Sequence, residues 1–199
     1  MPLILASSSP RRKALLLAAG YQFQVVPSTV EEAIQPGELP EDFARRLARD
    51  KALEVAGRVS RGAWVLGADT IVLLNGQILG KPADAPGAAR MLRLLSGAEH
   101  EVITGVCLAR APASLAATEH EVTRVTFRPL SEAEIAAYVR SGEPMDKAGA
   151  YAVQGLASRF VTRIEGCYFN VVGLPVARVD GMLRGQGAMK DLADSFPGP

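Results

Sequence analysis

Apolar and polar residues follow two different periods along the chain, and each change of period marks an expected element. Short apolar runs are typical of buried strands, and stretches whose apolar residues recur every three to four positions are typical of amphipathic helices. In the first half we expect helices near 10–19 and 40–57, and strands near 2–6, 21–26, 63–67, 71–74 and 77–79. The last two strands flank Asn75-Gly76, a strong signal for a tight hairpin. This alternation indicates an α/β protein.

The second half continues the mixed pattern and contains two longer strand patterns. We expect helices near 86–95, 131–139 and 174–183, and strands near 101–109, 119–127 and 160–164. Ser131 and Glu134 have the spacing of a capping box at the start of the second of these helices. An alanine-rich loop joins the two longest strand patterns, which indicates an antiparallel pair. Because no repeat, low-complexity segment or linker divides the chain, we expect one folded unit over residues 1–185 and a frayed tail over 186–199.

Composition and charge are those of an ordinary globular protein. Hydrophobic residues make up 48% of the chain and charged residues 22%. The 22 basic and 21 acidic residues give a net charge of +1, so neither nucleic acid nor membrane is expected as a partner. The N-terminus shows no basic leader with an apolar segment, and no later run reaches membrane-spanning length. We therefore expect a cytoplasmic protein. Because the net charge is close to zero, any anion site must come from a local group of cations.

The cysteines and histidines form no catalytic or metal-binding pattern. Cys107 and Cys167 lack C-x-x-C spacing, so reduced thiols are expected. His100 and His120 are isolated, which argues against a zinc site or a Ser/His/Asp triad and favours packing or surface positions. Any catalysis must then depend on carboxylates and cations.

A local anion site is indicated at the start of the first expected helix. Ser8 or Ser9 can cap this helix and Pro10 suits its first turn, which leaves free N–H groups and the positive dipole end pointing outward. Arg11 and Arg12 add positive charge where cations are unfavourable unless an anion neutralises them. A polyphosphate fits this arrangement. The alternative is that the serines only cap the helix and the arginines are solvated.

Lys51 falls within the apolar face of the second expected helix. That face is formed by Phe43, Ala44, Leu47, Ala48, Ala52 and Val55. An ammonium group in this position is costly unless its stem carries the charge out to solvent or its head meets an anion in a cleft. Spacing alone leaves both interpretations open.

Two carboxylates are candidates for a metal site. Glu32 follows the second expected strand, and Asp69 follows the apolar run 64–68, at the C-terminal end of a buried strand. Open α/β sheets bind ligands at such strand ends, although an Asp there is also common as a turn-former or helix cap. Together Glu32 and Asp69 can hold Mg²⁺, with phosphate oxygens and water as its other ligands.

Two loops offer weaker candidates. Lys81 lies in Gly80-Lys81-Pro82, a fair setting for a phosphate contact. Gln154 lies in the glycine-punctuated segment 146–155, where its amide can pair with a base edge; the alternative is a plain surface loop. Neither a Walker A motif nor a G-x-G-x-x-G after a strand occurs, so a phosphate site here is of another kind.

Several short motifs occur in order along nearly the whole chain. They are Leu5-Ala6-Ser7-Ser8-Ser9-Pro10-Arg11-Arg12, Gly67-Ala68-Asp69-Thr70, Gly80-Lys81-Pro82, Leu95-Ser96-Gly97, Thr104-Gly105-Val106, Ser141-Gly142-Glu143-Pro144 through Gly155, and Val171-Val172-Gly173-Leu174-Pro175. Together they resemble the Maf family of nucleoside triphosphate pyrophosphatases. Each motif alone is a weak signal, but the ordered set is specific.

The resemblance implies an α/β fold with a mixed sheet and two lobes around a deep central cleft, related to the inosine triphosphate pyrophosphatases and usually a homodimer. It implies hydrolysis of a nucleoside triphosphate between the α and β phosphates, with a divalent metal, Mg²⁺ before Mn²⁺ or Co²⁺. Asp69 matches the proton acceptor and Glu32 the second acidic site residue, and both would reach the metal together with the substrate phosphates. The matching phosphate contacts are Ser9, Arg11, Lys51 and Lys81. This chain has Glu31-Glu32 where the family has Asp-Glu.

Three further substrate-binding positions, Arg12, Thr70 and Gln154, resemble the branch of the family that hydrolyses dTTP and UTP. The 7-methyl-GTP branch has different residues there, including a bulky aromatic at the position of Arg12. We therefore expect dTTP and UTP, with modified pyrimidine triphosphates as further substrates. The alternatives are the same chemistry on 7-methyl-GTP or other purine triphosphates, and a non-catalytic nucleotide-binding regulator of septum formation.

Overall fold

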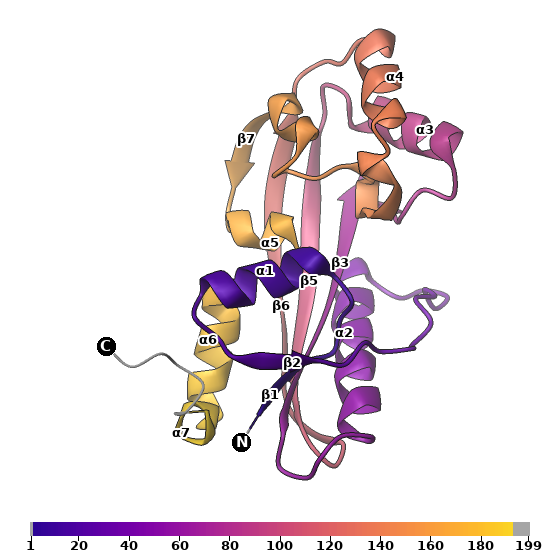
Figure 1. Cartoon of the computed structure of the whole chain (residues 1–199). Coiled ribbons are helices and arrows are strands. Elements are labelled where there is room, and N and C mark those ends of the chain that lie inside the picture. The colour runs from indigo at the N-terminus through magenta and orange to yellow at the C-terminus, as the bar shows by residue number, and fades with distance from the viewer. Residues whose placement is uncertain (1, 193–199) are drawn as a thin grey trace. The chain divides into compact units, whose positions relative to one another are not determined.

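A computed structural model describes residues 2–192, which divide into two compact units (Figure 1). The first unit takes in the described parts of 1–69, 104–121 and 173–199, and the second takes in 70–103 and 122–172. At three places the chain passes from one unit to the other inside a long strand. These strands are β3 (Trp64–Leu74), β5 (Glu99–Arg110) and β6 (Ser114–Phe127). Each of these strands therefore contributes residues to both units.

The strands form the mixed sheet that the family resemblance implied. They are hydrogen-bonded in the order β2-β1-β3-β5-β6-β7, and β4 pairs with β3. In the first unit, β1 (Leu3–Leu5) is parallel to both β2 (Phe23–Val25) and β3. In the second unit, β4 (Gln77–Leu79) is antiparallel to β3 and β7 (Val161–Glu165) is antiparallel to β6.

In the first unit, α1 (Pro10–Ala18), α2 (Pro40–Ala56) and α6 (Val176–Gly185) begin and end close to their expected positions. The short helix α7 (Ala188–Asp191) was not expected. α2 starts with a proline at its first position and carries two acidic residues in its first turn. Proline lacks only a hydrogen that would have no partner there, and the helix dipole favours negative charge at that end.

The C-terminal region differs from the frayed tail that we expected over 186–199. Ala188 and Leu192 are fully buried, and the indole nitrogen of Trp64 donates a hydrogen bond to Asp191 Oδ2 at 3.0 Å. Two buried apolar side chains and one polar contact fix this segment, although its composition alone does not indicate a helix. The last part of the expected tail, 193–199, lies outside the described residues.

Small residues let α2 approach the strands of the first unit closely. The core on this side consists mainly of alanines from α2 and from positions within or next to the strands, with Ile4, Val55, Val65 and Cys107 among them. A Cβ atom on Gly67 of β3 would collide with the carbonyl of Ala48 and lie 2.8 Å from the amide nitrogen of Ala52. Gly105 of β5 meets the backbone of α2 in the same way. The closest contacts are thus backbone against backbone, where no side chain can move aside.

We expect Gly67→Ala to lower the free energy of unfolding by about 3 kcal/mol or more, because an overpacked site whose neighbours are backbone atoms cannot relax cheaply. Denaturant unfolding measures this change. Gly181→Ala is the matched control: Gly181 lies in α6 with nothing within 4 Å of an added Cβ. There the substitution should be neutral or stabilise by roughly 0.5–1 kcal/mol. Equal effects at the two glycines would contradict the close approach.

The second unit combines an antiparallel hairpin with helices and short 3₁₀ segments. Its helices are α3 (Ala85–Leu95), α4 (Glu132–Arg140) and α5 (Tyr168–Val172), and its 3₁₀ segments are Glu143–Asp146, Ala148–Ala150 and Leu156–Phe160. The sequence did not predict α5 or the 3₁₀ segments. Both predicted local signals are confirmed: Ser131 and Glu134 form a complete capping box, and Asn75 and Gly76 turn the hairpin with φ of 50° and 79°. No helix among residues 2–192 combines the length and apolar character needed to cross a membrane.

Aromatic residues form the core of the second unit, and His100 belongs to this core. Its ring packs edge-on against Phe127 and Tyr151, and its Nε2 lies 2.8 Å from the Tyr151 hydroxyl. Burial lowers the pKa of His100 to about 4, so it is neutral at physiological pH. Of the packing and surface positions expected for the histidines, His100 has the packing one. Both cysteines are free, as expected.

Candidate active site

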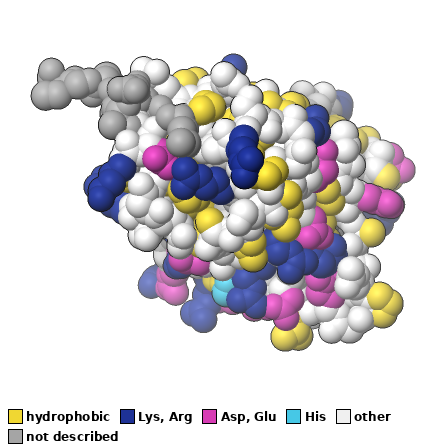
Figure 2. All heavy atoms as spheres, turned by 90° about the horizontal axis from the view of Figure 1, so that it is seen from below, with side chains coloured by type: hydrophobic (Ala, Val, Ile, Leu, Met, Phe, Trp, Pro, Cys, Tyr) yellow, Lys and Arg dark blue, Asp and Glu magenta, His cyan; other side chains and the backbone are white. Residues whose placement is uncertain are grey.

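Most charged side chains lie at the surface, with the two signs mixed. On the face shown in Figure 2, Lys and Arg side chains lie beside Asp and Glu side chains. In the first unit, for example, Arg178 pairs with Glu119 and Glu121 at 2.7 Å, with side chains that remain partly exposed. Exposed pairs of this kind contribute at most about 1 kcal/mol. Buried charges, which cost far more to place, are therefore better indicators of function.

Lys51 is such a buried charge. It lies on the inner face of α2 and is only 7% exposed. Its Nζ is 2.6 Å from Asp69 Oδ1 and 2.6 Å from Glu32 Oε1. The prediction that Lys51 falls on the apolar face is confirmed, and of the two interpretations left open the structure supports an ammonium that meets anions. Its stem does not carry the charge out to solvent.

Asp69 lies inside β3, not after the end of a strand. The sequence predicted two strands, 63–67 and 71–74, with Asp69 between them; instead one continuous strand runs from Trp64 to Leu74. Asp and Gly are poor strand residues, but pairing with β1 keeps the strand regular up to Leu66, and pairing with β4 begins again at Val72. The carboxylate is therefore held by a strand interior and is only 6% exposed.

Burial raises the pKa of Asp69 above its ordinary value. The positive charges of Lys51 and Arg12 act in the opposite direction, but burial is the largest effect. Glu32 is less buried, with 43% of its side chain exposed, because it lies on the coil between β2 and α2. The two carboxylates thus share one cation but differ in environment, a combination that separates acid–base roles in enzyme sites.

The start of α1 has the capped end that the sequence predicted. The Ser9 side chain accepts a hydrogen bond from the Arg12 amide at 3.4 Å, and Pro10 occupies the first position of the helix. Arg11 is partly exposed in this first turn. The start of α1 therefore has the capped first turn with an arginine that the sequence predicted, and an anion at this end stays a prediction.

The Arg12 side chain is buried and not solvated. Its Nε donates to the Gly173 carbonyl at 2.8 Å, and its Nη1 donates to Ser7 Oγ at 3.1 Å. Burial lowers the pKa of Arg12, whereas the charges of Asp69 and Glu32 raise it. The sequence assigned no role to Ser7 or to Gly173, although both lie in quoted motifs. A contact between residues 161 positions apart has no local signature in the sequence.

The other three predicted site residues belong to the second unit. Thr70 directly follows Asp69 on β3, so the two side chains point to opposite faces of the sheet. Lys81 and Gln154 are both exposed. The segments that carry them are joined, because the Gly149 amide donates to the Gly80 carbonyl at 3.1 Å. Predicted residues far apart in the sequence therefore come together in the first unit, at Lys51, whereas in the second unit the contact joins the neighbouring segments of Lys81 and Gln154.

The donor set fits a hard divalent cation that brings further ligands with it. Among residues 2–192 no group of three or more His, Cys, Asp or Glu side chains is arranged to hold a metal ion. Glu32 and Asp69 offer two carboxylates, and Mg²⁺ is commonly held by one or two carboxylates with water and substrate phosphates in its other positions. The site is therefore suited to a metal that arrives with a phosphorylated substrate, and unsuited to a closed structural metal.

Comparisons with known proteins identify the family of this chain. The family model described as "Maf-like protein" matches residues 2–186. A curated dTTP/UTP pyrophosphatase of Koribacter versatilis is 54% identical over 95% of this chain and 96% of its own. Those of Syntrophomonas wolfei and Geobacter sulfurreducens are 54% and 53% identical, over 92% and 94% of this chain and 96% and 97% of their own.

Among solved structures, a nucleoside-triphosphatase (dITP/XTP pyrophosphatase) from Mycobacterium abscessus aligns over 96% of this chain and 97% of its own. Its TM-score of 0.42 and its identity of 13% are too low to carry an argument about this chain. The family model and the curated relatives, by contrast, cover nearly the full length at high identity. On that ground, and with the motif residues grouped as described, this chain belongs to the Maf family.

Proposed function

We propose that this chain hydrolyses dTTP and UTP between the α and β phosphates, releasing the nucleoside monophosphate and pyrophosphate. The observation that carries the proposal is the buried Lys51 ammonium, which bridges the carboxylates of Asp69 and Glu32. A protein that only binds polyanions gains little from carboxylates in this position. The curated relatives named dTTP/UTP pyrophosphatase support the substrate assignment.

Asp69 is the proposed proton acceptor. A general base works best when its pKa lies nearer the working pH than that of an ordinary aspartate, and burial moves the pKa of Asp69 in that direction. Lys51 keeps the carboxylate oriented through a contact of 2.6 Å. Asp69 would take a proton from the water molecule that attacks the α-phosphorus, while the bond to the leaving pyrophosphate breaks.

We propose that Asp69 and Glu32 would hold a divalent cation together with substrate phosphate oxygens, with Mg²⁺ as the first choice and Mn²⁺ or Co²⁺ as the alternatives. The cation would withdraw negative charge from the phosphate oxygens. The chain's own cations support the same task. Arg11 and Ser9 at the start of α1, Lys51 on α2 and Lys81 after β4 are the proposed phosphate contacts. Preorganised charges of this kind stabilise the charge that builds up on the leaving group.

Base selection is assigned to Arg12, Thr70 and Gln154. Gln154 is exposed and carries an amide, which can donate to and accept from a uracil-like edge at once. Arg12 is fixed by Ser7 and Gly173, so its guanidinium offers a rigid boundary. Action as a homodimer in the cytoplasm, expected from the resemblance and from the sequence, remains a prediction.

The test is a substrate panel. We expect purified protein with Mg²⁺ to release pyrophosphate and monophosphate chiefly from dTTP and UTP, when these are compared with CTP, GTP, ATP, ITP and 7-methyl-GTP at equal concentration. Activity confined to a purine triphosphate would keep the chemistry and overturn the assignment of Arg12, Thr70 and Gln154. Nucleotide binding without turnover, with Mg²⁺, Mn²⁺ or Co²⁺, would instead favour a non-catalytic regulator.

A further inference from the structure

The coil that carries Glu32 is almost entirely exposed. It connects β2 to α2, and every residue from 31 to 37 is exposed. Ile34 is 53% exposed, so even the apolar side chain in the middle of this coil does not anchor it in the core. A carboxylate on such a coil keeps its position only if polar contacts hold the coil from outside.

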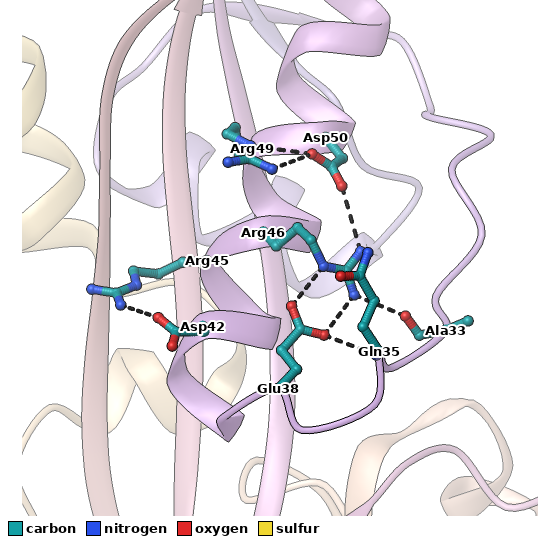
Figure 3. A network of polar contacts seen from close by, with 8 residues as sticks. All are labelled: Ala33, Gln35, Glu38, Asp42, Arg45, Arg46, Arg49 and Asp50. Atoms are coloured by element: carbon teal, nitrogen blue, oxygen red, sulfur yellow. Dashed lines mark hydrogen bonds and ion pairs between the residues drawn. The ribbon is translucent and has the colours of Figure 1, made fainter.

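Polar side chains of α2, and of Arg58 just after its end, supply these contacts on both sides of Glu32. Before Glu32, Arg58 donates to the Pro27 carbonyl, and Glu54 accepts from the Thr29 amide at 3.4 Å. After Glu32, Arg46 is the residue that reaches across (Figure 3). The coil is thus fastened to α2 at both ends, with the Lys51 contact of Glu32 between them.

Arg46 binds the coil through a fork of hydrogen bonds. Its Nε donates to Glu38 Oε1 at 2.6 Å, and its Nη2 donates to Glu38 Oε2 at 2.8 Å and to the Ala33 carbonyl at 2.9 Å. Glu38 Oε2 also accepts from the Gln35 amide at 3.0 Å. Figure 3 shows Glu38 and Ala33 meeting the Arg46 guanidinium, and Gln35 meeting Glu38. These contacts fix the coil from Ala33, the residue next to Glu32, to Glu38.

The guanidinium is itself held firmly. It lies 5.5 Å from the centre of the Phe43 ring, and its Nη1 is 3.5 Å from Asp50 Oδ2. Only 17% of the Arg46 side chain is exposed. The hydrogen bond from Arg46 lowers the pKa of Glu38, so the carboxylate stays ionised and the fork stays closed near neutral pH. A two-pronged contact with a carboxylate requires the planar geometry of arginine, which lysine cannot reproduce.

We propose that Arg46 is a positioning residue of the active site. By holding the Ala33 carbonyl and the Glu38 carboxylate, it fixes the coil in the conformation that brings Glu32 to Lys51. The proposal rests on the proposed function in so far as Glu32 takes part in turnover. Among residues 2–192, Arg46 makes its polar contacts with Ala33, Glu38 and Asp50 and none with Lys51 or Asp69, so its effect on the reaction is carried by the coil.

The first experiment compares Arg46→Met and Arg46→Lys with Arg45→Met. Arg45 is the matched control, because it is the neighbouring arginine on α2, is paired with Asp42 alone, and holds no residue of the coil. We expect both Arg46 variants to lose about 10- to 100-fold in kcat for dTTP, as is typical when a supporting contact of a catalytic ligand is removed, with a much smaller change in KM. Full rescue by Arg46→Lys, or an equal loss in Arg45→Met, would overturn the proposal.

A second measurement does not depend on turnover. Hydrogen exchange of the peptides that cover residues 27–39 should be faster in Arg46→Met than in the unchanged protein and in Arg45→Met. If the coil exchanges no faster, Arg46 does not hold it and the proposal fails. A chain that shows no pyrophosphatase activity on any nucleotide would refute the proposed function, and the exchange measurement would still decide whether Arg46 fixes the coil.

A double-mutant cycle then tests the route through Glu32. In the Glu32→Gln background, adding Arg46→Met should cost little further kcat, because the residue that Arg46 positions has already lost its charge. Losses that multiply would show that Arg46 acts independently of Glu32, and they would overturn the positioning role. Comparable melting temperatures of the variants separate this effect from unfolding.

Discussion

Asp69→Asn is expected to reduce dTTP and UTP turnover about 10²- to 10⁴-fold, the range that a positioned general base contributes. Asparagine has nearly the same shape but cannot accept the proton of the attacking water. The Lys51 ammonium keeps Glu32 as a partner, at 2.6 Å, so the fold should survive. Pyrophosphate release measures the loss, and circular dichroism with thermal unfolding confirms that the protein remains folded.

Asp42→Asn serves as the control for this substitution. Asp42 is also an aspartate with an arginine partner, Arg45, but it lies in the first turn of α2 and is half exposed. Its replacement should leave kcat almost unchanged. Near-normal turnover in Asp69→Asn would remove Asp69 from the chemistry, and a comparable loss in Asp42→Asn would point to a general effect of removing acidic residues from this unit.

Lys51→Met is expected to lower kcat about 10²-fold or more, because removal of one preorganised charge from an active site typically has this effect. It should also change the pH dependence of kcat/KM. The Lys51 charge lowers the pKa of Asp69 against the effect of burial. Without that charge Asp69 holds its proton to higher pH, and the acidic limb of the profile should move toward higher pH.

The raised pKa of Asp69 also predicts how the stability of the fold changes with pH. The pKa of Asp69 is higher in the folded chain than its ordinary value, so the folded chain binds more protons than the unfolded chain between these two values. The free energy of unfolding therefore falls as pH rises through this window, and it should fall more steeply in Lys51→Met. Lys190→Met, at an exposed position in α7, should alter neither profile. An acidic limb that stays in place in Lys51→Met would contradict the assigned role.

Local patterns were sufficient to predict most of the fold. The hairpin at Asn75-Gly76, the capping box at Ser131 and the start of α2 at Pro40 each depend on residues within four positions of one another. The break expected at Asp69 did not occur, because strand pairing before it, with β1, and after it, with β4, outweighs the low strand propensity of aspartate and glycine. The short α5 was missed, since five residues are too few to show a period.

The candidate site could be predicted only in part. The position of Lys51 on an apolar helix face could be predicted from the spacing of the apolar residues around it. A charged group there is costly to bury, which marked it as a candidate. Its two partners, Asp69 and Glu32, could not be predicted in this way, because the periodicity of a helix gives no information about which residues its inner face contacts. The inward turn of Arg12 toward Gly173 and the fork of Arg46 onto the coil depend on contacts made only after folding. Residue type indicated the chemistry, whereas tertiary structure supplied the supporting contacts.

The backbone contact of α2 with Gly67 and Gly105 has a consequence for attempts to transplant this site. A helix already at the closest distance that two backbones allow has almost no freedom to roll or to shift along the strands. The placement of Lys51 against Asp69 is thus determined by two residues that have no side chain. Copying only the ionic residues into another α/β scaffold would reproduce the charges without the separation between helix and strand that brings them into contact.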